Sequence, residues 1–213
     1  MEFLPEDLQK YVEDHTDPES DLLRQINRET HLHVLKPRML SGHLQGRVLS
    51  MLSHMIKPKR ILEIGTYTGY AALCLAEGLD ATGKLITIDN NEELSTRTKA
   101  YFQQSDFEKQ IEMRVGNAMD IIPELNEQWD LVFIDADKEN YSNYFDLVID
   151  QLSVGGFIIA DNVLWSGKVF DPSKKDGATE SIRAFNEKIH TDPCVENVLF
   201  PIRDGLMVVR KIR

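Results

Sequence analysis

Hydrophobic positions follow two different periods along this chain. In the first quarter they recur every three to four residues, which predicts amphipathic helices at about 4–15, 18–32 and 42–56. The second of these opens with Pro18 and acidic residues, as the start of a helix commonly does. The pattern therefore predicts a helical segment ahead of any sheet.

From residue 60 onward, short apolar runs rich in β-branched residues alternate with helical patterns. The predicted strands are Arg60–Ile64, Lys84–Asp89, Ile111–Val115, Asp130–Asp135 and Phe157–Asp161. The predicted helices lie at about 70–79, 92–104, 118–125 and 141–152. This alternation predicts right-handed βαβ units and a parallel sheet covered by helices on both faces.

The end of the chain changes this rhythm. A helix at about 179–190 precedes two strands, 195–202 and 206–212, and Asp204-Gly205 between them is a hairpin signal. The sheet is therefore expected to end in an antiparallel pair. The sequence contains no internal repeat and no interdomain linker. We therefore expect one domain over 1–213, with a helical cap at 1–56 and an α/β core at 57–213.

Composition fits a globular domain and excludes some partners. The 213 residues are 42% hydrophobic and 28% charged, and the formal net charge of −11 disfavours nonspecific nucleic-acid binding, which needs a basic face. No signal peptide or membrane-length apolar run is found, so we expect a cytoplasmic protein without a membrane partner. Cys74 and Cys194 have no paired spacing and are expected to be reduced thiols.

The most informative stretch is Ile61–Tyr70, where an apolar strand runs into a Gly-rich turn. Gly65 and Gly69 form G-x-x-x-G, which is neither the G-x-G-x-x-G of dinucleotide binders nor a P-loop. Glu63 would repel a pyrophosphate and suits a cationic or hydroxyl-rich ligand. Such turns are also common as tight connections, so the turn alone leaves both interpretations open.

Acidic residues stand at the carboxyl ends of four predicted strands, namely Glu63, Asp89, Asp135 and Asp161. In a parallel sheet these ends share one edge, where ligands of open α/β sheets bind. Each acid alone could be a turn former or a helix N-cap. Together they would repel one another unless a cation or hydroxyl donors compensate.

Two of these positions suggest particular ligands. Asp89 lies 20 residues after Gly69, the spacing at which an acid accepts from ribose hydroxyls, so a nucleoside cofactor without a phosphate clamp is expected. S-adenosylmethionine meets that description. Asp135, Asp161 and Asn162 supply only hard oxygen ligands, which suit Mg²⁺, with Ca²⁺ or Mn²⁺ as alternatives. The cysteines and histidines show no zinc motif.

Five segments, in order, carry a resemblance to a known family. They are Ile61–Tyr70, Leu85–Asp89, Val115–Ala118, Phe133–Tyr141 and Asp161–Gly167. Together they resemble the cation-dependent O-methyltransferases, the family of caffeoyl-CoA and catechol O-methyltransferases. The likeness covers essentially the whole chain, and its most specific pieces are Asp-Ala-Asp-Lys-x-x-Tyr at 135–141 and Asp-Asn-x-Leu-Trp-x-Gly at 161–167.

The resemblance implies a fold and a set of site residues. The fold is a Rossmann-like seven-stranded, mostly parallel sheet of order 3-2-1-4-5-7-6 with helices on both faces and an N-terminal helical cap. The matching cofactor residues are Met39, Ser41, Glu63, Gly65, Thr66, Tyr67, Ala71, Asp89, Gly116, Asn117, Ala118, Asp135 and Asp137. The matching metal ligands are Asp135, Asp161 and Asn162, and the matching substrate residues are Lys138, Trp165 and Ser166. A homodimer is implied as well.

The role of Lys138 follows from the same resemblance, as the general base that takes the acceptor's proton. A neighbouring cation and partial burial would both disfavour its ammonium form. The alternative is a surface lysine that caps a loop. Trp165 could wall the substrate pocket or shield the core, and Tyr141 and Tyr144 are expected to pack with the following helix.

Three departures from the family pattern bear on the predicted site. Ala71 stands where many relatives have a Ser that bonds the cofactor's carboxylate, and Ser166 replaces an Asn that contacts substrate in the plant enzymes. The N-terminal lysine pattern that those enzymes use near their substrate is also absent. These changes favour a small catechol-like or caffeoyl-type phenol over a CoA thioester. The predicted function is an S-adenosylmethionine-dependent, divalent-metal-dependent O-methyltransferase. The alternative is a methyltransferase with the same cofactor that acts on RNA, protein or another small molecule.

Rival classes lack their signatures. An NAD-dependent oxidoreductase would need G-x-G-x-x-G after the first strand. Amino-methylating enzymes carry Asn/Asp-Pro-Pro-Tyr, and Asp161-Asn162-Val163-Leu164 occupies that loop here. A module that only holds the cofactor would be expected to have lost a metal ligand or Lys138, and all of them are present.

Overall fold

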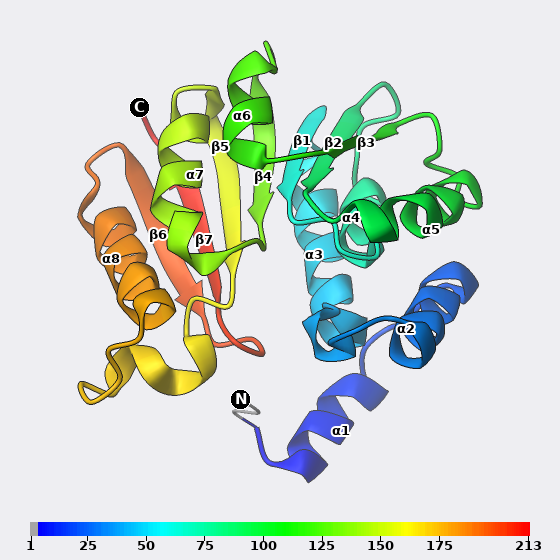
Figure 1. Ribbon diagram of the computed structural model, residues 1–213, viewed down its shortest axis with the longest axis horizontal. Coiled ribbons are helices and arrows are strands. Elements are labelled where there is room, and N and C mark those ends of the chain that lie inside the picture. Colours follow the sequence, from blue (N-terminus) through cyan, green and yellow to red (C-terminus); the bar gives the residue numbers. More distant parts are fainter. Residues whose placement is uncertain (1–3) are drawn as a thin grey trace. The chain divides into compact units, whose positions relative to one another are not determined.

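The computed structural model describes residues 4–213, which divide into two compact units, Leu4–Asn117 and Ala118–Arg213 (Figure 1). The seven strands of this part of the chain belong to one sheet in the order β3-β2-β1-β4-β5-β7-β6. That order and the expected fold class are confirmed. The interpretation as one domain with a cap and a core stays a prediction.

Of the elements in residues 4–213, the first unit contributes three strands and most of the α-helices. In chain order its elements are α1 (Glu6–Asp14), α2 (Asp21–His33), η1 (Pro37–Met39), α3 (Gly42–Ile56), β1 (Arg60–Ile64), α4 (Tyr70–Ala76), β2 (Lys84–Asp89), α5 (Glu92–Gln103) and β3 (Ile111–Val115). Strand β2 pairs in parallel with β1 on one side and β3 on the other. Every residue of α4 is buried, so the helix that follows the Gly-rich turn lies in the core.

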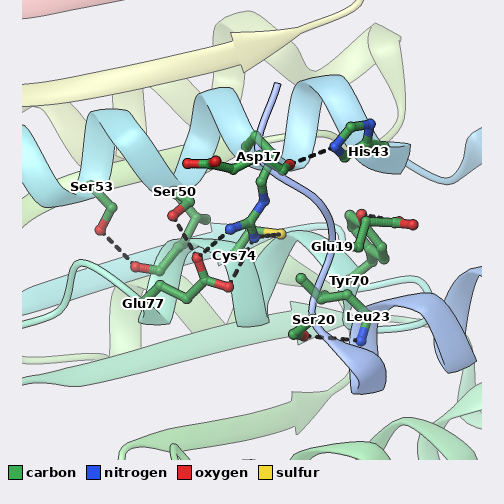
Figure 2. Close-up of polar contacts among 12 residues, drawn as sticks. Asp17, Glu19, Ser20, Leu23, His43, Ser50, Ser53, Tyr70, Cys74 and Glu77 are labelled. Carbon is green, nitrogen blue, oxygen red and sulfur yellow. Dashed lines mark hydrogen bonds and ion pairs between the residues drawn. The ribbon is translucent and has the colours of Figure 1, made fainter. Parts of the chain in front are cut away.

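Helix α4 is held against α3 by close packing and an internal ion pair. A Cβ added at Gly46 would lie 2.6 Å from the ring of Tyr70, which shows how closely the helices approach. The Arg47 guanidinium donates to both oxygens of Glu77 at 2.9 and 2.8 Å, and Ser50 donates to the same carboxylate at 2.5 Å (Figure 2). The hydrogen bond from Arg47 to Glu77 raises the pKa of that guanidinium. The Arg47 guanidinium therefore remains charged, and its two bonds to Glu77 hold α3 and the end of α4 together.

Strand β3 lies at one end of the strand order and carries charged side chains. Glu112 pairs with Lys84 of β2 and with Arg114, two residues further along β3. The hydrogen bond from Lys84 holds the pKa of Glu112 below its usual value of 4.5. This edge of the sheet is therefore lined by ion pairs.

The second unit contains the other four strands. Its elements are α6 (Ala118–Ile121), η2 (Ile122–Glu124), β4 (Trp129–Ile134), η3 (Lys138–Asn140), α7 (Tyr141–Ile149), β5 (Leu152–Asp161), η4 (Trp165–Phe170), α8 (Gly177–Thr191), β6 (Val195–Phe200) and β7 (Leu206–Lys211). Strands β4 and β5 run parallel, whereas β7 is antiparallel to both β5 and β6. The predicted hairpin is thus confirmed. Figure 1 shows α7 and α8 side by side against these strands.

Several predicted boundaries were wrong for local reasons. Strand β5 begins at Leu152 rather than Phe157, because its pairing with β4 continues through a register shift. The Gly155-Gly156 pair has the composition of a turn, which is why the sequence pattern predicted a later start. The helix expected at 118–125 ends at Ile121 and continues only as a 3₁₀ turn, since Pro123 offers no backbone N–H. Helix α4 stops at Ala76 rather than near residue 79. Among the helices from residue 4 to the end, none is long and apolar enough to cross a membrane.

Candidate functional site

The Gly-rich turn after β1 needs both of its glycines. The Gly65 N–H extends the sheet by donating to the Ile88 carbonyl at 2.9 Å, with φ at 101°. Gly69 has φ at 80°, and an added Cβ would lie 2.6 Å from the Phe102 ring. Only glycine tolerates this combination of backbone and close approach. The G-x-x-x-G spacing is therefore a requirement of this turn's backbone.

Behind the turn, Glu63 ends a chain of hydroxyl groups. The Thr87 hydroxyl donates to the Glu63 carboxylate, so the 2.5 Å contact between Thr66 and Thr87 must be a bond that the Thr66 hydroxyl donates. Glu63 is fully buried and Thr66 is nearly so. The hydroxyl groups of Thr66 and Thr87 are therefore oriented in one direction, toward the Glu63 carboxyl group. The acidic residue predicted to suit a cationic ligand thus lies directly behind the turn.

Asp89 at the end of β2 organises the same turn. Its Oδ2 accepts from the Tyr67 N–H at 2.7 Å and its Oδ1 from the Asn91 N–H at 2.8 Å. The Gly116 N–H bonds the Asp89 carbonyl at 2.9 Å. A carboxylate has about four lone-pair positions, so acceptor capacity remains for ligand hydroxyls. The structure therefore brings Asp89 and the predicted residues Tyr67 and Gly116 together.

The segment before α3 is tied to the turn by Tyr67. The Tyr67 hydroxyl lies 3.1 Å from the Leu35 carbonyl oxygen and 3.3 Å from that of Lys36. Burial raises the pKa of this phenol, which keeps its proton available for donation. The predicted cofactor residues Met39 and Ser41 follow a few positions later, Met39 half exposed and Ser41 buried.

The remaining predicted cofactor residues of this group, Ala71, Asn117 and Ala118, lie at the starts of helices or just after β3. Ala71 is buried in the first turn of α4. Gly116 follows the last residue of β3 with φ at 152°, and Asn117 after it is exposed. Ala118 is the first residue of the second unit and begins α6.

The predicted metal ligands lie at the ends of two neighbouring strands. Ile134 of β4 is paired with Ala160 of β5 in parallel register, so Asp135 and Asp161, each the next residue along its strand, stand side by side. Asp161 is only 3% exposed, and its Oδ1 accepts from the Asn162 N–H at 2.6 Å. Asn162 is left-handed, with φ at 60°. The backbone therefore turns sharply at Asn162, the residue whose amide is a predicted metal ligand.

Lys138 stands beside these carboxylates. Its Nζ donates to Asp135 Oδ1 at 3.1 Å and to the Tyr141 hydroxyl at 2.6 Å, and its side chain is 10% exposed. The Lys138 side chain is therefore mostly buried, and both of its bonds are to residues three positions away. Its role as a general base stays a prediction. The ammonium also lies 5.9 Å from the centre of the Trp165 ring.

Tyr141 was expected only to pack with the following helix, but its hydroxyl also forms hydrogen bonds at the predicted site. The ring is buried and meets Phe185 edge-on, while the hydroxyl donates to the Asp161 carbonyl at 2.9 Å. Burial, and then the carboxylates of Asp135, Asp161 and Asp137, raise the pKa of this phenol well above its usual value. Tyr141 thus remains neutral amid the negative charge of the predicted site.

Asp137 is held in a similar way. Its two oxygens accept from the Tyr144 hydroxyl and the Asn140 amide, each at 2.5 Å. Tyr144 is buried as expected. Its hydrogen bond to Asp137 could not be predicted, because the sequence pattern around Tyr144 indicates only a helix.

Trp165 and Ser166 follow in the loop after β5. Two ammonium groups approach the Trp165 ring, Lys138 Nζ at 5.9 Å and Lys168 Nζ at 5.8 Å from the ring centre. The indole nitrogen is buried and has no hydrogen-bond partner. Ser166 is exposed, and its N–H donates to Asp204 Oδ1 at 2.5 Å. The sequence pattern around Asp204 predicted only a hairpin turn, so the contact with Ser166 was missed.

The donor set is compatible with a hard cation. Over residues 4–213 no group of three His, Cys, Asp or Glu side chains is arranged to hold a metal. The predicted set instead contains two carboxylates and one amide oxygen. Oxygen donors that leave positions for water and substrate are what Mg²⁺ prefers.

Comparison with known proteins adds an independent finding. A family model described as O-methyltransferase matches residues 13–212. The caffeoyl-CoA O-methyltransferase of Medicago sativa is 32% identical over 181 residues, which covers 79% of this chain and 73% of that protein. A catechol O-methyltransferase of Niastella koreensis is 33% identical over 156 residues, or 71% of each chain.

A solved structure agrees with these likenesses. The O-methyltransferase from Bacillus cereus in complex with SAH is 29% identical, with a TM-score of 0.88 and coverage of 96% of this chain and 97% of that one. Among curated relatives of this kind, the chain spans between 66% and 90% of their length.

Proposed function

Because this chain belongs to the O-methyltransferase family, we propose that it methylates a hydroxyl of a small catechol-like or caffeoyl-type phenol with the help of a divalent cation. Membership confirms the predicted family and enzyme class, an S-adenosylmethionine-dependent O-methyltransferase. The phenolic acceptor, the cation and the individual site residues are the proposed part.

The observation that carries the proposal is the cluster at the ends of β4 and β5. Asp135 and Asp161 stand side by side with Asn162 next in the chain, and Lys138 is hydrogen-bonded to Asp135. We propose that Asp135, Asp161 and Asn162 hold Mg²⁺, with Ca²⁺ or Mn²⁺ as alternatives. When bound, such a cation supplies Lewis acidity, which lowers the pKa of an acceptor hydroxyl and fixes its direction.

The chain's own groups would handle the proton and the cofactor. Lys138 in its neutral form has a lone pair at Nζ for the phenolic proton. The phenolic oxygen then bonds to the methyl carbon as the sulfur–methyl bond breaks, and sulfur keeps the electron pair. Glu63 would favour the sulfonium before transfer, and Asp89 would accept from the ribose hydroxyls. Because the leaving group becomes neutral, alignment contributes most of the rate.

The acceptor residues support a phenol. Trp165 offers an aromatic face and a buried N–H with no partner, and Ser166 is exposed next to it. An aromatic ring with adjacent oxygens would use both features. A homodimer is proposed as well, because α1 buries none of its residues and exposes Leu8 and Tyr11. The mass in solution, measured by light scattering, tests that assembly.

The function is tested by methyl transfer from labelled S-adenosylmethionine to a panel of catechols and non-phenolic acceptors. We expect transfer to catechols, its loss in EDTA and its return with added Mg²⁺. Transfer that survives complete metal removal would contradict the cation's role. Transfer to a non-phenolic acceptor alone would favour the alternative function.

Asp161→Ala sharpens the test. Turnover should be lost while SAH still binds, because Asp161 belongs to the acceptor residues only. Asp146→Ala is the matched control, since that aspartate forms an exposed ion pair with Lys188. Equal turnover in both variants would remove Asp161 from the site.

A further inference from the structure

The loop that carries the proposed acceptor residues has an unusual backbone. Asn162, Trp165 and Ser166 have φ at 60°, 47° and 54°, and Gly167 follows at 76°. Left-handed backbone at a residue other than glycine is strained and persists only where the surroundings enforce it. Contacts elsewhere in the fold must therefore shape residues 162–167.

The tip of this loop is held by the turn between β6 and β7. The Val163 N–H donates to the Gly205 carbonyl at 3.2 Å, and the Leu164 N–H donates to the Asp204 carbonyl at 2.9 Å. The Ser166 N–H donates to Asp204 Oδ1 at 2.5 Å. Ser166 and Asp204 are 38 residues apart in sequence, and the two segments share three hydrogen bonds.

Gly205 permits this contact. An added Cβ would lie 2.5 Å from Leu164 Cγ and 3.0 Å from the Leu164 nitrogen, and φ at 90° also excludes other residues. The base of the loop is held separately, by Tyr141 on the Asp161 carbonyl and by Asn186 on the Val163 carbonyl. Asp204 thus holds the loop at Ser166, beyond Leu164, whereas Arg183 bonds the carbonyls of Lys168 and Val169 further along.

We propose that Asp204 is a positioning residue for the acceptor side of the reaction. Its carboxylate fixes the left-handed backbone at Trp165 and Ser166. Because the Trp165 N–H donates to the Asn162 carbonyl at 3.1 Å, the directions of the Trp165 indole and the Asn162 amide both depend on that backbone. The Asp204-Gly205 pair thus serves both as a hairpin turn and as the support of this loop. The part that concerns Asn162 rests on the proposed function, in which that amide binds the cation.

Three variants separate this role from a general loss of stability. Asp204→Ala removes the acceptor for the Ser166 N–H. Asp204→Asn keeps an amide oxygen at the same place and should restore the parent behaviour. Asp192→Ala is the matched control, because Asp192 also accepts a backbone N–H, that of Cys194 at 2.8 Å, in another turn of the same unit.

The first measurement needs neither metal nor substrate. The chain has two tryptophans, and Trp129 is fully buried with its N–H bonded to Gln151, so acrylamide quenching of the protein reports Trp165. Asp204→Ala should raise the quenching, whereas Asp204→Asn and Asp192→Ala should match the parent. The second measurement is Mn²⁺ binding, followed as loss of the free-ion resonance signal, with affinity expected to fall about 10-fold in Asp204→Ala.

The outcomes are distinguishable. Parent-like quenching in Asp204→Ala would overturn the proposal, as would equal quenching in Asp204→Ala and Asp192→Ala. If the parent itself binds no Mn²⁺, the metal part of the proposed function fails, and quenching still decides the role of Asp204. If Asp204→Ala does not fold, Asp204→Glu replaces it, because it keeps the charge and displaces the acceptor. Raised quenching then supports the proposal, and parent-like quenching overturns it.

Discussion

Tyr67 is the residue at which the Gly-rich turn and the segment before α3 meet. Its N–H bonds Asp89, its hydroxyl bonds the Leu35 and Lys36 carbonyls, and its own backbone is left-handed at φ 50°. Lys36 at the other end of the link is left-handed too. A single phenol thus connects the proposed ribose-binding acid to the chain that leads to Met39.

Tyr67→Phe removes only the hydroxyl. We expect the KM for S-adenosylmethionine to rise about 2- to 10-fold with kcat unchanged, since one hydrogen bond contributes about 0.5–1.5 kcal/mol. Steady-state kinetics at saturating acceptor measures both constants. Tyr11→Phe is the control, because Tyr11 is exposed and stacks on His15. An unchanged KM would show that the link does not affect the cofactor.

Residue types at strand ends were predictable, and their hydrogen-bond partners were not. Asp89, Asp135 and Asp161 follow apolar runs, and parallel strands place such positions at one edge. The bond from Thr87 to Glu63 joins residues 24 apart, and the bond to Asp204 spans 38. Those partners depend on strand register and on a hairpin in a later part of the chain, which local patterns do not encode.

At the scale of elements, the α3–α4 packing decides where α4, the helix after the Gly-rich turn, lies. Ser53 of α3 donates to the Leu75 carbonyl at 2.6 Å. At Gly78, just after α4, an added Cβ would lie 2.2 Å from backbone atoms of Ser53 and His54. The segment after α4 and the end of α3 are therefore in direct backbone contact at this point.

Gly78→Ala should therefore lower the free energy of unfolding by about 1–3 kcal/mol, because overpacking forces the backbone to shift. Denaturant titration followed by circular dichroism measures this. Gly177→Ala is the matched control: its Cβ would find only Glu139 Oε1, at 3.5 Å, and it lies in the first turn of α8. That substitution should be neutral or slightly stabilising. Similar losses in both variants would contradict the packing argument.

Strands were predicted better than helix ends. The bounds of β1, β2 and β3 match the apolar runs, because buried strands stop where polarity returns. Residues 152–156 were missed since a glycine pair inside a strand has the composition of a turn. Helix α8 was recognised from its periodicity and begins earlier than expected, where Asp176 caps Thr179.

For the whole molecule, a set of acids determines the response to low pH. The pKa of Glu29 is held below 4.5 by the hydrogen bond from Tyr101, and that of Glu112 by Lys84. The pKa values of Asp80, Asp171 and Asp176 lie below 3.8, first because of hydrogen bonds from Thr82, Ser173 and Thr179. A lowered folded-state pKa contributes stability above the unfolded pKa, and that stability is lost as pH falls through the folded value.

The melting temperature should thus be flat near neutrality and fall once the pH drops below about 4.5. Thermal melts across the acid range, followed by circular dichroism, measure it. Tyr101→Phe removes the main cause of the Glu29 shift and should make the decline less steep. A melting temperature that is constant down to about pH 3 would contradict this account.

The ion pairs along β3 have one more consequence, for behaviour at high concentration. An edge strand with unpaired backbone groups can recruit the strand of another molecule and start a fibre. Glu112 and Arg114 place opposite charges on that edge, so a second copy approaching in register would bring like charges together. The same acid that favours the folded state above its pKa thus also keeps concentrated protein from aggregating through this edge.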